Sequence, residues 1–238
     1  MNEHMRILEG VATQYDSVND FDYHLIRYTY RDLRPYLRGP KVIELGCSSG
    51  VMTRLLCQDF PALHVVDGSA RYLQDVARTV PATVAFHHSL FEDFQPPHRF
   101  NDLVLASALE HLPDPLALLP RLRDWLEPGG RLHVVVPNAH SIHRLVGVHM
   151  GMLEHPTSFT ERDRMLDHRR VYDADLLRTH LHQCGWSVEQ MRGVFLKPLA
   201  NAQMQQFSLA QLEAFYKVGQ EMPRSCAMLY ALAQVQES

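Results

Sequence analysis

Cysteine is scarce in this chain of 238 residues, and basic residues do not outnumber acidic ones. The four cysteines include no CxxC pair, which argues against a disulfide framework or a thiolate zinc site and favours a reducing compartment. The 23 lysines and arginines face 27 aspartates and glutamates, so the formal net charge is −4. No global positive field is therefore present to attract nucleic acid or an anionic lipid surface.

Long apolar runs are also missing. No stretch approaches the roughly 18 apolar residues that a membrane span requires, and the first eight residues lack the apolar core of a signal peptide. We therefore expect a soluble, cytoplasmic protein with no membrane partner. Because 46% of the residues are hydrophobic and the length suits one core rather than two, we predict a single domain over residues 1–238.

Short β-rich runs alternate with amphipathic helical stretches through the middle of the chain. The runs predicted as strands are 41–45, 62–66, 83–87, 103–106 and 131–136, and those predicted as helices are 51–59, 70–79 and 115–126. Strands that are apolar on both faces indicate an α/β fold, with a doubly wound, mostly parallel sheet covered by helices on both sides. Asp114 is expected to cap the third helix, and Pro120 to kink it or delay its start.

The flanking segments complete this organisation. Residues 1–40 read as a helical lead-in, and residues 41–137 form the alternating core. Residues 138–172, rich in His, Met and Gly, are predicted to be an insertion over the open edge of the sheet. Residues 173–238 then contain a helix at 173–184 and two closing strands at 186–196 and 227–235.

The sharpest local pattern is the run VIELGCSSGV at residues 42–51, a buried strand that enters a turn of small residues and then a helix. Small residues allow a ligand to approach the backbone and the N-terminus of the helix closely. Asp67 ends the next predicted strand about 20 residues later, where a carboxylate can accept both hydroxyls of a ribose. This order and spacing predict a nucleoside-binding α/β fold.

From about residue 11 to residue 194, the sequence resembles class I S-adenosylmethionine-dependent methyltransferases, in particular the small-molecule branch that includes the ubiquinone-biosynthesis O-methyltransferases. Residues 44–50 (ELGCSSG) look like the acidic, glycine-rich first motif of that family, and residues 65–69 (VVDGS) look like its ribose-binding second motif. Residues 100–115 match the motif of the fourth strand, and residues 126–132 match the usual entry to strand five.

The resemblance implies a Rossmann-like sheet of seven strands, the last one antiparallel, and S-adenosyl-L-methionine as the cofactor. Ser48 stands where the family usually has its middle glycine, so its side chain is expected to point away or to bond the ligand. Arg27 is a candidate partner of the cofactor's carboxylate, although a surface salt bridge explains an isolated arginine equally well. The cofactor-binding residues implied are Tyr15, Arg27, Glu44, Gly46, Ser48, Gly50, Asp67, Gly68, Leu90, Phe91 and Ser107.

Candidate catalytic residues follow the fourth strand and close the insertion. His111 can accept a proton from a substrate, because an unperturbed imidazole titrates near working pH; alternatively, Glu110 and His111 only cap and orient their loop. His168, Arg169 and Tyr172 are expected to face the substrate, with His168 as a competing base and Arg169 holding an anionic group. The charged run at residues 161–164 is typical of a solvated loop.

Fifteen histidines raise the question of a metal site. His180 and His182 lie two apart on a predicted helix and therefore point to different faces. His140 and His143 can share a face, but no acidic partner stands at ligand spacing. We therefore predict no metal site, and catalysis without a divalent metal.

These patterns predict an enzyme that transfers a methyl group to a hydroxyl or amino group of a small-molecule metabolite, in specialised metabolism or sugar modification. A nicotinamide-dependent oxidoreductase is one alternative, because it shares the acid after strand two, although its loop usually reads GxGxxG. A non-catalytic cofactor-binding protein of the same fold is another. The sequence does not identify the substrate, for which an anionic small molecule is the candidate. The candidate assembly is a homodimer.

Overall fold

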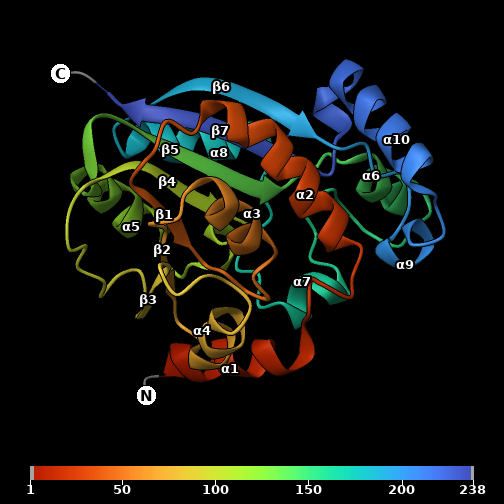
Figure 1. The fold of residues 1–238 in the computed structure, drawn as a ribbon. Coiled ribbons are helices and arrows are strands. Elements are labelled where there is room, and N and C mark those ends of the chain that lie inside the picture. Colours follow the sequence, from red (N-terminus) through yellow and green to blue (C-terminus); the bar gives the residue numbers. More distant parts are fainter. Residues whose placement is uncertain (1–2, 237–238) are drawn as a thin grey trace.

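The computed structural model describes residues 3–236, which form one seven-stranded sheet with helices on both sides (Figure 1). The strands are β1 (Val42–Leu45), β2 (His64–Asp67), β3 (Ala85–His88), β4 (Phe100–Ala106), β5 (Leu126–Pro137), β6 (Trp186–Val194) and β7 (Met228–Val235). Their order in the sheet is β3-β2-β1-β4-β5-β7-β6. Only the pairs that involve β7 are antiparallel, so the predicted fold class is confirmed.

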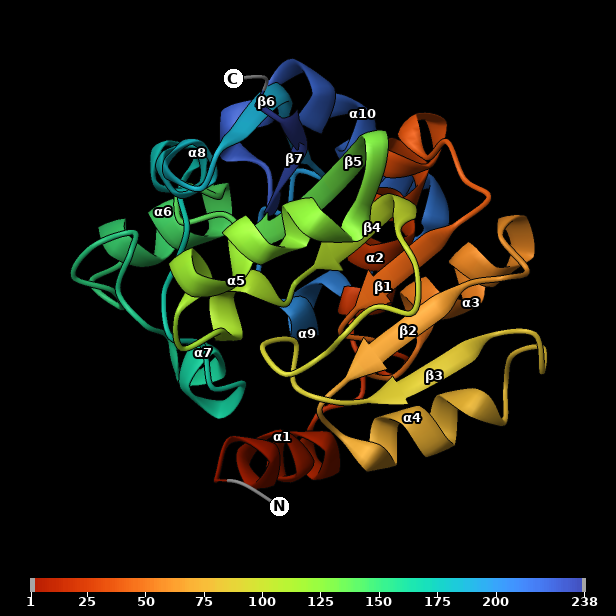
Figure 2. The ribbon, with the colours of Figure 1, turned by 90° about the vertical axis from the view of Figure 1, so that its left-hand side faces the viewer.

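The helices separate into two layers that each cover an apolar face of the sheet. They are α1 (Glu3–Gln14), α2 (Asp22–Leu33), α3 (Val51–Asp59), α4 (Ala70–Ala77), α5 (Pro115–Leu122), α6 (Ile142–His149), α7 (Glu161–Met165), α8 (Ala174–Gln183), α9 (Asn201–Met204) and α10 (Leu209–Glu221). Figure 2 shows α5 and α8 on one side of the sheet and α2, α3 and α4 on the other. Leu56 and Leu73 belong to the core on the α3 side, and Leu118 and Leu177 belong to the core under α5 and α8.

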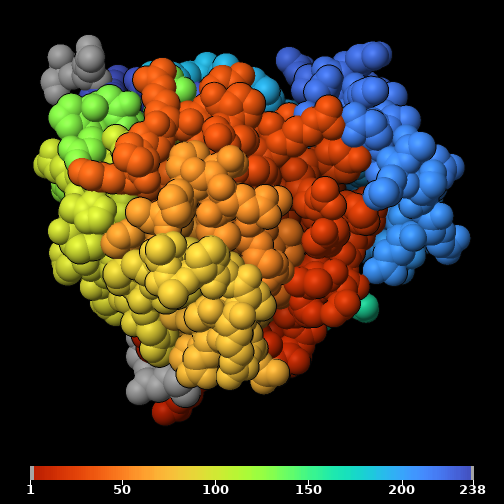
Figure 3. Space-filling view, in the orientation of Figure 1, coloured from red at the N-terminus to blue at the C-terminus, as the bar shows by residue number. Residues whose placement is uncertain are grey.

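Several boundaries differ from those predicted. Strands β4 and β5 are longer than expected, because Leu126 already pairs with Phe100 across a register shift at the start of β4. The helical lead-in is two helices, of which α1 packs on α4 and lies at one end of the molecule (Figure 2). In the space-filling view, the red N-terminal segment lies between the orange and yellow residues of α3 and α4 and the blue C-terminal helices (Figure 3).

Helix α5 tolerates Pro120 in its interior. Asp114 caps its start by accepting from the backbone N–H groups of Leu116 and Ala117, as predicted, so the proline does not delay the helix. The carbonyl of Leu116, four residues before Pro120, loses its usual helical donor and instead faces the Cys184 thiol, with Sγ at 3.8 Å. The helix ends at Leu122, earlier than expected.

The insertion between β5 and α8 contains α6 and α7 and returns to the sheet where it left it. An isolated parallel bridge joins Asn138 to Tyr172 at its two ends. Both helices therefore lie beyond the carboxyl ends of the parallel strands, where α/β sheets bind ligands. Among residues 3–236, no helix has the length and apolar character needed to span a membrane.

Candidate functional site

A cavity of about 580 Å³ opens at the carboxyl ends of β1, β4 and β5. This volume is in the range of small-molecule pockets. One end, here called the cofactor end, is lined by Glu44, Gly46, Ser48, Asp67, Gly68, Leu90 and Phe91. The opposite, polar end is lined by Asp22, Arg144, Arg162, Asp163, Lys197 and Asn201. Tyr15, Ser107, Glu110, His111 and His168 also line the cavity.

The turn after β1 requires backbone conformations that glycine adopts most easily. Gly46 has φ +87°, and a Cβ there would lie 3.2 Å from the Cβ of Ala108 in the loop after β4. Ser48 adopts φ +45°, a left-handed conformation that non-glycine residues rarely adopt. Gly50, at φ +77°, precedes α3 and is not among the residues that line the cavity. The turn thus exposes its backbone to the cavity.

Asp67 connects this turn to the end of β2 through hydrogen bonds. Its Oδ2 accepts from the backbone N–H groups of Cys47 and Ser48, at 2.9 and 3.3 Å, and its Oδ1 accepts from Ser69 N at 2.8 Å. Burial raises the pKa of this carboxyl, and the backbone hydrogen bonds oppose that effect. The carboxylate oxygens have further lone pairs, so Asp67 can accept a ligand's hydroxyl while it holds the loop.

Glu44 is the most deeply buried acid at the cofactor end. It accepts a hydrogen bond from Thr53 Oγ1 at 2.6 Å, and burial raises its pKa to about 8. A cationic group in the cavity would favour its charged form. Nearby, Ser17 Oγ is buried without a hydrogen-bond partner among the described residues, so it can meet a polar group of a ligand.

The wall of the cofactor end is apolar and is closed by α1. Leu90 and Phe91 follow β3, and Leu8 of α1 packs against Gly68. Glu9 fixes α1 in this position, because its carboxylate accepts from Ser69 Oγ and from the backbone N–H of Ala70. Together these side chains form a surface suited to a flat, apolar ring such as adenine.

Tyr15 links the cofactor end to the polar end. Its hydroxyl donates to Asp22 Oδ2 at 2.6 Å, and the guanidinium of Arg162 lies over its ring at 5.5 Å. Arg162 also forms an ion pair with Asp22 at 2.7 Å. Burial alone would raise the pKa of Asp22, but the positive charge of Arg162 opposes this effect, and the pKa is lowered. The sequence-based expectation that residues 161–164 form a solvated loop is therefore wrong for Arg162.

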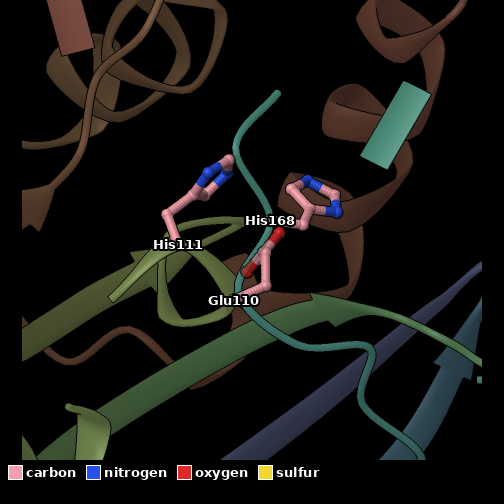
Figure 4. Close-up of side chains that lie close together, drawn as sticks. All are labelled: Glu110, His111 and His168. Atoms are coloured by element: carbon pink, nitrogen blue, oxygen red, sulfur yellow. The ribbon is translucent and has the colours of Figure 1, made fainter. Parts of the chain in front are cut away.

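A second network holds His168. Its Nδ1 lies 2.8 Å from Asp163 Oδ1, and Asp163 Oδ2 pairs with Arg144 Nη1 at 3.0 Å. An ionised carboxylate can only accept, so Nδ1 of His168 donates, and in the neutral imidazole Nε2 then carries the lone pair. Figure 4 shows that His168 lies beside Glu110 and His111. Burial lowers the pKa of His111 to about 3, whereas burial raises that of Glu110 to about 7.

Lys197 is the cation of the polar end that has no carboxylate partner. It is 7% exposed, its Nζ donates to Asn201 Oδ1 at 2.6 Å, and no carboxylate oxygen among residues 3–236 lies within 4.0 Å of Nζ. Burial lowers its pKa to about 8, against the opposing effects of Asp22 and Asp20. Sequence reasoning missed this residue, because a single lysine after β6 belongs to no motif.

Four predicted residues do not line the cavity, namely Gly50 in the turn before α3 and Arg27, Arg169 and Tyr172. Arg27 is exposed on α2 and contacts the Tyr23 hydroxyl. Arg169 is also exposed, and it pairs with Asp167 at 2.9 Å. Tyr172 is fully buried in the core beneath α8, where its hydroxyl lies 3.2 Å from His180 Nδ1. The expectation that Arg27, Arg169 and Tyr172 contact a ligand is therefore wrong, because none of their side chains lines the cavity, and Gly50 supports the turn without lining the cavity.

Comparisons with known proteins agree with this geometry. A family model described as a methyltransferase domain matches residues 21–191. The trans-aconitate 2-methyltransferase of Methylobacterium radiotolerans is 30% identical over 215 residues, which cover 79% of this chain and 82% of that protein. The protein of the same name from Deinococcus radiodurans is 36% identical over 117 residues, 48% of this chain and 43% of its own length.

Solved structures of other proteins share the fold. The structure of the Burkholderia thailandensis 1,6-didemethyltoxoflavin-N1-methyltransferase, with bound 1,6-didemethyltoxoflavin and S-adenosylhomocysteine, matches with a TM-score of 0.60 at 15% identity. The match covers 90% of this chain and 79% of that chain.

Proposed function

This chain belongs to the class I S-adenosylmethionine-dependent methyltransferases, and we propose that its methyl acceptor is an oxygen atom of a small metabolite that carries a carboxylate group. The observation that carries the proposal is the burial of the Lys197 ammonium group, which lines the cavity and has no ionic partner among residues 3–236. Burying a charge is costly unless an opposite charge or several hydrogen bonds compensate it. An anionic substrate group at the polar end would supply that compensation.

The other charges of the polar end leave Lys197 available for this role. Arg162 is paired with Asp20 and Asp22, and Arg144 is paired with Asp163. The two arginines therefore build the wall, whereas the ammonium of Lys197 has one polar partner, the amide oxygen of Asn201. A carboxylate is the expected ligand, and the relatives named trans-aconitate 2-methyltransferase act on a substrate of that class.

Two oxygen acceptors fit this cavity. A carboxylate is already deprotonated, so methylation at that oxygen needs alignment and no general base. A hydroxyl acceptor is the second candidate, because Asp163 orients His168 with its Nε2 free to take a proton, and the same base would serve an amino group. His111 is the weaker base of the two, because its pKa is about 3.

The protein's contribution is mainly binding and alignment. Bound S-adenosylmethionine supplies an electrophilic methyl group. The turn at residues 46–48, held by Asp67, fixes the position of the cofactor end, and Leu90 and Phe91 exclude water from it. Lys197 holds the substrate's carboxylate at the opposite end, which orients the acceptor oxygen toward the centre of the cavity.

A substrate panel with a single substitution tests the proposal. Small mono-, di- and tricarboxylic acids, trans-aconitate among them, are compared with their neutral amides by release of S-adenosylhomocysteine. We expect turnover of acids only, and Lys197→Met should lower kcat/KM by about tenfold to a hundredfold, because a charge-assisted hydrogen bond contributes roughly 1.5 to 3 kcal/mol. Affinity for S-adenosylhomocysteine should not change.

Lys217→Met on α10 is the matched control, because Lys217 is exposed and lies outside the cavity. The proposal fails if neutral amides are turned over as well as acids, or if Lys197→Met and Lys217→Met behave alike. Treating the product with mild base separates the two acceptors, because a methyl ester hydrolyses and a methyl ether does not.

A further inference from the structure

Three side chains with metal-ligating atoms converge on the cavity wall between the loop after β4 and the segment after α7. Glu110, His111 and His168 each offer one ligand atom, and these atoms all lie within 4.8 Å of one another (Figure 4). A cation with bonds of about 2.0 to 2.2 Å holds its ligand atoms about 3 to 4 Å apart. Shifts of about an ångström in these side chains would therefore complete its coordination.

The carboxylate of Glu110 has no partner to explain its burial. Glu110 is 1% exposed, and neither of its carboxylate oxygens has a hydrogen-bond partner among the described residues. A buried carboxylate normally pairs with a cation or accepts several hydrogen bonds. Glu110 therefore has unused capacity on the side where the two imidazoles lie.

The surroundings of His168 match those of a metal-binding histidine. Metal-binding histidines usually donate their second N–H to a carboxylate or a backbone carbonyl, which fixes the tautomer. His168 donates Nδ1–H to Asp163 at 2.8 Å, and the ring of His111 packs edge to face on the ring of His168, with 4.7 Å between the ring centroids. The imidazole of His168 thus has an anchor besides the nitrogen that it can offer to the cluster, and His111 is held against it by ring packing.

The backbone segments that carry the three side chains are tied together. The guanidinium of Arg170 donates to the carbonyls of Leu109, Leu112 and Pro113, at 3.1, 2.5 and 3.0 Å. The backbone N–H of Arg169 donates to the carbonyl of Glu110 at 2.9 Å. The cluster is therefore built on a preformed support rather than on two independent loops.

We propose that Glu110, His111 and His168 bind a divalent transition-metal cation such as Zn²⁺ or Mn²⁺, with its remaining positions open to the cavity. Two imidazoles and one carboxylate favour such ions over Mg²⁺ and Ca²⁺, which prefer oxygen ligands. In the cavity, the open positions would take oxygen atoms of the substrate, a role that rests on the proposed function. This proposal replaces the expectation from the sequence that the protein has no metal site.

Metal binding is measured without substrate. The full chain, dialysed against EDTA and then freed of chelator, is titrated with ZnCl₂ in a calorimeter and with CoCl₂ by visible absorption. We expect one site per chain with a Kd below about 10 µM for Zn²⁺, at least a hundredfold tighter than for MgCl₂. Glu110→Gln and His168→Gln should each weaken Zn²⁺ binding at least tenfold, whereas His140→Asn, an exposed histidine in the same insertion, should leave it unchanged.

The proposal is overturned if no saturable site appears in the parent protein, or if Mg²⁺ binds as tightly as Zn²⁺. It is also overturned if His140→Asn weakens binding as much as Glu110→Gln does, because the bound ion is then adventitious. If one variant does not fold, the proposal is judged from the other variant and from the ratio of the Zn²⁺ and Mg²⁺ dissociation constants of the parent protein. A metal site in a protein that methylates no carboxylate would refute the proposed substrate alone, and methylation of acids without metal binding would refute this inference alone.

Discussion

At the cofactor end of the cavity, the lining groups come from three short stretches of sequence, 44–48, 67–68 and 90–91. At the polar end they come from α2, α6, α7, α9 and the segment before α9. The first end is held by hydrogen bonds between a carboxylate and nearby backbone N–H groups. The second is held by ion pairs between distant side chains, such as Arg162 with Asp20 and Asp22.

This difference separates the two functions of the cavity. A backbone cradle with an aspartate anchor tolerates little change, and it suits a ligand that every member of the family binds. A set of long side chains on separate helices can be exchanged without altering the sheet, and it suits a substrate that differs between members. Substitutions at the two ends should therefore affect different measurements.

The largest expected effect is on stability at the polar end. Arg144 is 6% exposed, and it donates to Asp163 and to the backbone carbonyls of Pro156 and Ser158. Arg144→Met should lower the free energy of unfolding by about 3 kcal/mol, because it leaves a buried carboxylate and two carbonyls short of a donor. Urea denaturation measures the loss, and Arg164→Met, at an exposed position of α7, should cost less than about 0.5 kcal/mol. Equal effects would contradict a network at this end.

The next effect is on the cofactor. Asp67→Asn should weaken binding of S-adenosylhomocysteine by about 1.5 to 3 kcal/mol, or tenfold to a hundredfold, because the carboxylate orders the turn and, in the role that the sequence predicts, would also accept a hydrogen bond from the ligand. Asp75→Asn, at an exposed position of α4, is the control. If calorimetry shows that the folded Asp67→Asn variant binds S-adenosylhomocysteine as tightly as the parent protein does, the anchoring role assigned to Asp67 is wrong.

A smaller effect concerns pH at the polar end. Lys197 is charged below its pKa of about 8 and neutral above it, so kcat/KM for an acidic substrate should fall by about fivefold between pH 8 and pH 9, as the protonated fraction decreases from about one half to about one eleventh. Asp22 and Asp20 raise this pKa, and Arg162 and Arg144 lower it, so all four must stay intact in the test. Lys197→Arg should abolish this decrease because arginine stays protonated. A profile that is the same in both proteins would contradict the role of Lys197.

The smallest effect is expected at Arg169. Its side chain is 40% exposed and pairs with Asp167, so Arg169→Ala should change kcat/KM less than twofold and stability by less than about 0.5 kcal/mol. The sequence alone predicts a tenfold to hundredfold loss, as for a guanidinium that holds the substrate. Steady-state kinetics of this one variant therefore distinguish the position seen in the structure from the one expected from the pattern.

The successes and failures of the sequence-based predictions follow the range of the interactions. The sequence predicts Glu44, Gly46, Ser48 and Asp67 at the ligand site, and all four line the cavity, because their positions depend only on one strand and the next. The charged neighbours of Arg162 in the sequence predict a solvated side chain, whereas its ion-pair partners, Asp20 before α2 and Asp22 at the start of α2, lie 142 and 140 positions away. Tyr172 ends the insertion, but its side chain enters the core under α8 rather than the cavity.

By itself, the sequence determined the alternation of strands and helices, the parallel sheet, and the turn with left-handed backbone that forms the cofactor end. These features arise from local hydrophobic periodicity and from the conformations that small residues permit, which the chain carries in windows of about ten residues. Only the tertiary structure decided that Glu110, His111 and His168 meet, that Asp163 orients His168, and that Lys197 is buried without an ionic partner. Such meetings depend on how separate helices pack over the sheet, and burial, which sets the pKa of each group, exists only once that packing is complete.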